Sequence, residues 1–272
     1  MKYLIMQFAL FVLSTAIVFS QNRIELNTEL MNSTFKIQGS GSIGTAFILG
    51  KQLNDSTAKY VLVTADHVLR NMKGEQAIIY LRKKVSDNYD KIEYNFQIRD
   101  KEKQLWVKHS TADVAAMYIP LPSIIKISIL STEMLGTDDI YNKIDIHPGD
   151  EFSLLGYPLG QEANRFGFPI ARKGIIASYP IVPAKSVGTY LLDIKIFKGN
   201  SGGPVYFAQS GRTYRGALHS ETTQFIAGLV SQERLHVTQD DSPYKTSVEF
   251  QQLYLAEIVP AVFIKETLDM LP

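Results

Sequence analysis

The segment Lys198-Gly199-Asn200-Ser201-Gly202-Gly203-Pro204 places one serine among three glycines and a proline. A serine hydroxyl is a poor nucleophile unless a turn exposes it and a neighbouring base removes its proton. Glycines permit the backbone angles that such a turn needs, and they let a carbonyl approach main-chain N–H groups closely. The segment therefore predicts a nucleophilic serine with an oxyanion hole beside it. A purely structural turn between two strands is the alternative interpretation.

A nucleophilic serine requires a base and a group that orients the base. His67 follows the apolar run Tyr60–Val63, which places it at the end of a predicted strand. Asp113 stands at the start of another apolar stretch. A rival acid is Asp193, eight residues before the serine, whereas Asp66 is interpreted as a solvated or locally bonded neighbour of the base. The histidines outside this motif are His109, His147, His219 and His236.

The three segments Thr64–Val68, Ala112–Met117 and Gly199–Pro204, in this order, resemble the histidine, acid and nucleophile motifs of the trypsin-like serine peptidases. They are most similar to those of the cysteine-free bacterial HtrA/Deg branch. The glycine-rich run Gly39–Leu49, which leads toward the histidine, resembles the corresponding hairpin of that family.

This resemblance implies a role for each residue of the site. Ser201 attacks the carbonyl, His67 accepts the proton, and Asp113 fixes the histidine tautomer. The backbone N–H groups of Gly199 and Ser201 then bind the developing oxyanion. Such a reaction requires no metal and no organic cofactor.

The fold class follows from many short strand candidates with turn signals about every ten residues, which indicate an all-β protein. The resemblance implies two six-stranded antiparallel β-barrels with the active site in the cleft between them. We expect the N-terminal barrel at about 30–120, a linker at about 121–145 and the C-terminal barrel at about 146–257. Helical spacing of apolar residues predicts a C-terminal helix at about 258–271. Many HtrA-like proteases carry a PDZ domain after this point, and we expect none here.

Substrate specificity depends on two segments in the family. They are the residues just before the nucleophile and the strand that pairs with the substrate backbone. The resemblance assigns these roles to Lys195, Phe197, Leu229, Val230 and Ser231, while Arg215–His219 is a less similar candidate for the strand. If Lys195 points into the pocket, an acidic substrate side chain is favoured. If strand alternation turns it to solvent, no such preference follows.

The N-terminus combines Lys2 with an apolar run, Tyr3–Phe19, and predicts a secretory signal peptide at 1–20. An uncleaved membrane anchor is the alternative, but the run is short for a bilayer span. The peptidase domain then covers 21–272 and is exported to the periplasm or secreted, without stable membrane association. Because the chain has no cysteine, core burial must stabilise it without disulfides.

The charges are balanced, with 28 Lys and Arg against 27 Asp and Glu, and they favour no nucleic-acid partner. We therefore expect an exported serine endopeptidase that hydrolyses proteins or peptides through an acyl-enzyme. The sequence leaves a homo-oligomer open. The alternative function is a protease-like binding or chaperone module with a latent or inactive site, for which the loop at about 161–173 is the candidate regulator.

Overall fold

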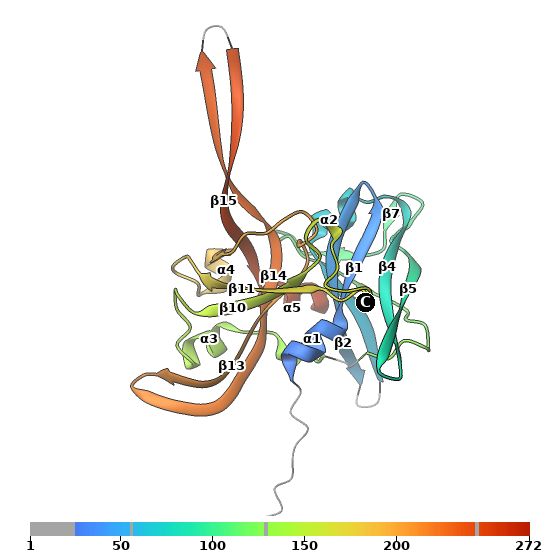
Figure 1. Ribbon diagram of the computed structural model, residues 1–272, viewed down its shortest axis with the longest axis horizontal. Helices are drawn as coiled ribbons and strands as arrows, with labels where there is room; N and C mark the ends of the chain where they lie inside the picture. The colour runs from blue at the N-terminus through green and yellow to red at the C-terminus, as the bar shows by residue number, and fades with distance from the viewer. Residues whose placement is uncertain (1–24, 55–56, 128–129, 243–244) are drawn as a thin grey trace, which may run out of the picture.

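The computed structural model describes residues 25–54, 57–127, 130–242 and 245–272. The predicted signal peptide at 1–20 lies outside these ranges. The chain folds into two β-rich halves that lie side by side, with helix α5 (Ala261–Asp269) close to both (Figure 1). In the described part of the chain, no helix is both long enough and apolar enough to cross a membrane.

The N-terminal half is a seven-stranded sheet in the order β5-β4-β1-β2-β3-β9-β8. Along β4, Ala77, Ile79 and Leu81 are buried at alternate positions, because successive side chains of a strand point to opposite faces. Helix α1 (Leu26–Ser33) precedes the sheet and α2 (Asp66–Asn71) follows β3. The strands of this half are β1 (Thr34–Ser40), β2 (Ser42–Asn54), β3 (Thr57–Thr64), β4 (Lys73–Val85), β5 (Asn88–Gln97), β8 (Val107–Lys108) and β9 (Ala115–Tyr118), with β6 (Arg99–Asp100) and β7 (Lys103–Gln104) forming a separate pair.

The C-terminal half is a closed six-stranded barrel in the order β10-β11-β12-β15-β14-β13. The predictions of an all-β fold and of a six-stranded C-terminal barrel are confirmed. The sheet of the N-terminal half has one strand more than the six predicted, because Val107 pairs with Ala116 and so adds β8 beside β9. The barrel strands are β10 (Glu151–Gly156), β11 (Ile170–Ile176), β12 (Tyr190–Asp193), β13 (Pro204–Tyr214), β14 (Ala217–Ser242) and β15 (Lys245–Pro260).

The connecting segments contain short helices. The stretch predicted as a linker holds η1 (Thr132–Met134) and α3 (Asp138–Lys143), while η2 (Pro158–Gly160) and α4 (Ala184–Val187) lie between barrel strands. The predicted C-terminal helix is confirmed as α5, but it begins at Ala261 and not at 258. Residues 258–260 still pair in the barrel, where Ile258 lies opposite Tyr190.

Two hydrophobic cores lie on the two sides of strand β14. Leu229 belongs to the core of the N-terminal half, and its neighbour Val230 belongs to the core of the barrel. Alternation along one strand therefore supplies side chains to both cores. Beyond the barrel, β14 and β15 continue as a hairpin that projects from the body of the molecule (Figure 1).

Candidate active site

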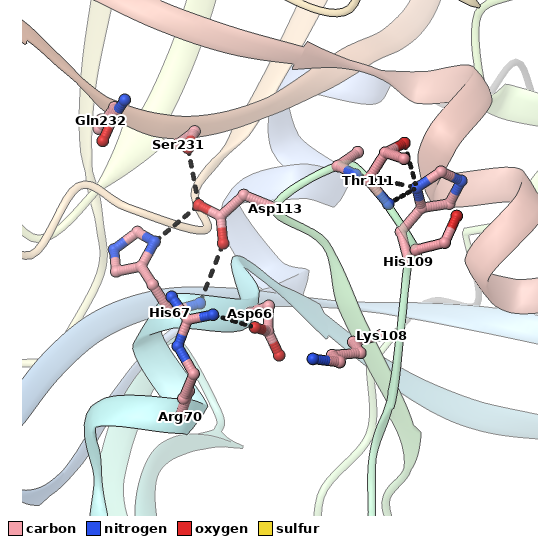
Figure 2. Close-up of a pocket in the computed structure, with 11 residues that line it drawn as sticks. Asp66, His67, Arg70, Lys108, His109, Thr111, Asp113, Ser231 and Gln232 are labelled. Atoms are coloured by element: carbon pink, nitrogen blue, oxygen red, sulfur yellow. Dashed lines mark hydrogen bonds and ion pairs between the residues drawn. The ribbon is translucent and has the colours of Figure 1, made fainter.

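Two neighbouring strands place His67 and Asp113 next to each other. Strand β3 ends at Thr64, directly before the helix α2 that carries His67 in its first turn. Thr64 pairs with Ala115, so the loop before β9 lies beside the start of α2. His67 Nδ1 lies 2.7 Å from Asp113 Oδ2, and the His67 backbone N–H donates to Asp113 Oδ1 at 3.0 Å (Figure 2). The carboxylate thus contacts both the ring and the backbone of the histidine.

Ser231 is a third partner of this carboxylate, since its Oγ donates to Asp113 Oδ2 at 2.7 Å. Burial by itself would raise the pKa of Asp113. The hydrogen bonds and charge of His67, together with the Ser231 hydroxyl, outweigh burial and lower the pKa of Asp113 to about 2. The carboxylate is therefore ionised at neutral pH and accepts a hydrogen bond from the Nδ1–H of His67. This tautomer leaves Nε2 as the acceptor, as a general base requires.

The nucleophile segment forms a tight turn. The Asn200 N–H donates to the Phe197 carbonyl at 2.9 Å, and Gly199 has φ +99°, as the third position of a type II turn requires. A Cβ atom at Gly199 would lie 2.2 Å from the Tyr157 carbonyl oxygen. The Lys198 carbonyl accepts the Leu159 N–H at 2.7 Å. Because N–H and C=O point in opposite directions across a trans peptide, the Gly199 N–H points away from Leu159.

A second close approach joins this turn to the N-terminal half. A Cβ atom at Gly202 would lie 2.1 Å from Thr64 Oγ1, and the φ of Gly202 is +82°. Only glycine fits this contact. It brings Ser201 to the chain segment that leads into His67. Within the residues that the structure describes, no hydrogen bond joins Ser201 Oγ to His67, and such contacts often tighten only when substrate is bound.

The five predicted substrate-binding residues have different positions. The side chains of Leu229 and Val230 are fully buried in the two cores, so a contact of this strand with substrate would have to come from its backbone, and the prediction for these two residues stays a prediction. Their run of apolar residues reflects burial on both faces of β14. Ser231 comes next on the strand and hydrogen-bonds to Asp113, a role that its sequence context did not indicate.

Lys195 and Phe197 precede the nucleophile turn and remain partly exposed. The Lys195 ammonium lies 5.1 Å from the centre of the Phe197 ring and 4.4 Å from that of Tyr254. Arg172 lies 5.9 Å from the Phe197 ring and donates a hydrogen bond to the Lys195 carbonyl. The segment before the serine is therefore cationic.

The remaining acids take other roles. Asp193 ends strand β12 with an exposed side chain, whereas Asp113 contacts His67 directly. Asp66 is buried, pairs with Arg70 at 3.0 Å and accepts the Trp106 indole N–H at 2.9 Å, so it is locally bonded and not solvated. In the described part of the chain, no cluster of three or more His, Asp or Glu residues is placed to hold a metal ion.

A cleft of about 380 Å³ opens beside the His67–Asp113 pair (Figure 2). Its lining includes the loop before Asp113 and, on strand β14, Ser231 and Gln232. The Lys108 side chain also lines it, and this lysine forms no ion pair with another described residue. The cleft thus lies on the Asp113 side of the histidine, and Ser201 does not line it.

Comparison with known proteins identifies the family. Residues 44–213 match the model of the trypsin-like peptidase domain, and the chain belongs to this family. No functionally curated protein matches the chain.

The chain also resembles solved structures at low sequence identity. An inactive mutant form of Rv3671c from M. tuberculosis H37Rv is 16% identical, with a TM-score of 0.47 and coverage of 92% of this chain and 90% of that one. Protease Anisep from Arthrobacter nicotinovorans is 14% identical, with a TM-score of 0.47 and coverage of 87% and 94%. The thermostable serine protease AL20 from an extremophilic microorganism is 12% identical, with a TM-score of 0.48 and coverage of 87% and 95%.

Proposed function

We propose that this member of the trypsin-like peptidase family is a serine endopeptidase in which Ser201, His67 and Asp113 act together. The observation that supports this most strongly is the Asp113 carboxylate, which accepts hydrogen bonds from the backbone N–H and the ring Nδ1 of His67 and from the Ser231 hydroxyl. An ionised carboxylate in this position holds the imidazole in the tautomer that can accept a proton. It also stabilises the imidazolium that forms when Ser201 gives up its proton.

The reaction then takes two covalent steps. Ser201 Oγ bonds to the substrate carbonyl carbon while His67 Nε2 takes its proton, and the carbonyl electrons form an oxyanion near the Gly199 and Ser201 N–H groups. The imidazolium next protonates the leaving amine, and the C–N bond breaks to give an acyl-enzyme. Water, deprotonated by His67, releases the acyl group and restores Ser201.

A fluorophosphonate probe tests this assignment. We expect the purified protein to be labelled at Ser201, as located by mass spectrometry. Ser201→Ala and His67→Ala should both abolish labelling, and Asp193→Asn, a change in the rival acid, should leave it intact. Absence of labelling in the folded wild-type protein would support instead the protease-like binding module with a latent site.

We further propose that the peptidase is exported, on the basis of the N-terminal sequence 1–20, and that it is closest to the HtrA/Deg branch, on the basis of the three motifs. Expression of the protein with its native N-terminus tests whether it is exported. The intact mass of the exported protein should correspond to cleavage near Ser20, and a protein that keeps residues 1–20 and stays with the membrane would contradict it.

For specificity, we propose a preference for an acidic side chain at the residue before the scissile bond. Support comes from Lys195 and Arg172, which place two cations beside Phe197, just ahead of the nucleophile turn. Matched peptides with Glu or Leu at that position test it, with Lys195→Met as the variant that should lose the preference. Faster cleavage after Leu by the wild type would refute it.

A further inference from the structure

The two N–H groups proposed to bind the oxyanion lie in a segment whose carbonyls are all engaged elsewhere. The Lys198 carbonyl accepts the Leu159 N–H at 2.7 Å, and the Asn200 carbonyl accepts the Gly203 N–H at 2.9 Å. These two bonds orient the peptide planes that carry the Gly199 and Ser201 N–H groups. The remaining two carbonyls, those of Gly199 and Ser201, both accept hydrogen bonds from Thr45.

Thr45 therefore contacts both oxyanion residues. Its Oγ1 donates to the Gly199 carbonyl at 2.6 Å, and its backbone N–H donates to the Ser201 carbonyl at 2.9 Å. Among the four bonds that the described residues make to carbonyls 198–201, the one from Thr45 Oγ1 is the only one donated by a side chain. It is thus the one contact that a substitution can remove without changing the backbone.

The environment of Thr45 fixes this hydroxyl in place. The residue is fully buried on β2, in the N-terminal half, and its Oγ1 also accepts the Tyr157 N–H at 3.2 Å. The hydroxyl donates to the Gly199 carbonyl and accepts from the Tyr157 N–H. It therefore links the residue that follows β10 to the nucleophile turn. A buried hydrogen bond of this kind holds its partners in one geometry because no water is available to replace it.

We infer that Thr45 is a positioning residue for the oxyanion hole: its hydroxyl holds the peptide between Gly199 and Asn200 in place and so restrains the Gly199 backbone, which keeps the Gly199 N–H available to the reacting carbonyl. This inference rests on the proposed function, because it concerns N–H groups that act only if Ser201 attacks a carbonyl. Thr45 itself touches no reacting atom. Its effect passes through the geometry of Gly199.

Three variants isolate the hydroxyl. Thr45→Val removes the donor and keeps the shape, whereas Thr45→Ser keeps the donor and removes a methyl group. If Thr45→Val does not fold, Thr45→Ala removes the hydroxyl without adding bulk and replaces it in the comparison. Urea unfolding of each variant shows which of them retain the native fold.

The first readout is the rate of Ser201 labelling by the fluorophosphonate, divided into the maximal rate and the probe concentration at half-maximal rate. Thr45→Val should lower the maximal rate by about 10- to 100-fold, because small displacements of a catalytic group have effects of this size. The half-saturating concentration should change by less than about threefold, since ground-state contacts are kept. Thr45→Ser should label at a rate within about threefold of the wild type, as expected when the interaction that matters is preserved.

The second readout does not depend on catalysis. Amide hydrogen exchange of residues 198–203 should be about tenfold faster in Thr45→Val than in wild type or Thr45→Ser, because local opening of the turn becomes easier. If the wild type does not label at all, the proposed function fails, and exchange alone decides whether Thr45 holds the turn. Equal labelling and equal exchange in Thr45→Val and wild type would overturn the inference, as would Thr45→Ser being as impaired as Thr45→Val.

Discussion

Among the described residues, each half of the molecule buries one arginine, and the two arginines are stabilised in different ways. Arg212, on β13 of the barrel, forms a two-pronged ion pair with Asp150, with both N–O distances at 2.7 Å. Arg82, on β4 of the N-terminal half, is equally buried but has no carboxylate within ion-pair distance among the described residues. One cation is neutralised by a single residue, and the other depends on many neutral groups.

The neutral groups around Arg82 come from distant parts of the chain. Its guanidinium donates to the Tyr157 hydroxyl and to four carbonyls, and its central carbon lies 4.4 Å from the ring centre of Phe35 and 4.4 Å from that of Phe168. Burial lowers the pKa of Arg82, and the Tyr157 hydroxyl partly opposes this shift, but a guanidinium stays charged in proteins. The accepting carbonyls are those of Met31, Asn32, Thr34 and Gly167.

The difference shows what each arginine contributes to the fold. Arg212 and Asp150 form an ion pair that fastens the turn before β10 to β13, and Arg212 also donates to the carbonyls of Ile144 and Asp145. Arg82 joins the end of α1 to the loop around Gly167, which belongs to the other half of the chain. An ion pair can be replaced as a unit, whereas backbone carbonyls cannot be removed by substitution. The following predictions test this distinction.

The largest effect is expected for Arg82→Met. The substitution leaves several buried acceptors without a donor, and each such group costs about 1–3 kcal/mol, so we expect a loss of about 4 kcal/mol in the free energy of unfolding. Urea unfolding at pH 7 measures it. The free energy of unfolding of Arg82→Lys should lie between those of the wild type and Arg82→Met, because an ammonium keeps the charge but not the planar set of donors. Unchanged stability of Arg82→Met would contradict this prediction and would show that water donates hydrogen bonds to these carbonyls in the variant.

A smaller effect is expected for Asp150→Asn, which leaves the Arg212 charge buried without its counter-charge. We expect a loss of about 3 kcal/mol, as is typical when one partner of a buried pair is removed. The double variant Arg212→Met with Asp150→Leu should recover part of this loss, because a buried ion pair can be replaced by apolar residues, although the carbonyls of Ile144 and Asp145 lose their donor. If the double variant is no more stable than Asp150→Asn, the distinction between the two arginines is wrong.

The partly buried charge of Asp113 differs from the charges of both arginines because it titrates. Its pKa is lowered from 3.8 to about 2, so its contribution to stability is complete above pH 4 and is lost as the pH falls toward 2. The size of this shift corresponds to about 2 kcal/mol. We expect Asp113→Asn to be less stable than wild type at pH 6 and to approach it at pH 2, as measured by urea midpoints. A difference that does not depend on pH would contradict the assignment.

The smallest effect is expected for an exposed pair. Lys173 and Glu151 lie 2.6 Å apart across β10 and β11, with side chains 65% and 57% exposed. Water screens such a pair, and Lys173→Ala should change the free energy of unfolding by less than about 0.5 kcal/mol. A loss comparable to that of Asp150→Asn would mean that burial does not explain the difference among these charges.

Some parts of the site could be predicted from short segments alone. The glycines around Ser201 indicate a tight turn because only glycine tolerates the close contacts found at Gly199 and Gly202. The position of His67 after an apolar strand is likewise a local feature, and so is the helical period that predicts α5. Each of these signals depends on neighbours within a few residues.

Other features could not be predicted in this way. The burial of Leu229 and Val230 depends on which face of β14 meets which core, and a register shift between Val230 and Gln232 changes the alternation beyond them. The hydrogen bond from Ser231 to Asp113 spans 118 residues of sequence. It depends on the packing of one half of the molecule against the other.

By itself, then, the sequence determined the all-β class, the serine turn and the order of histidine, acid and serine, because these rest on local backbone preferences and on motif residues. Only the tertiary structure decided that Asp113 bonds to Ser231, that Thr45 holds the Gly199 carbonyl, and that Arg82 joins the two halves. Contacts between residues far apart in the chain depend on the packing of two separate cores. No local pattern of residues specifies that packing.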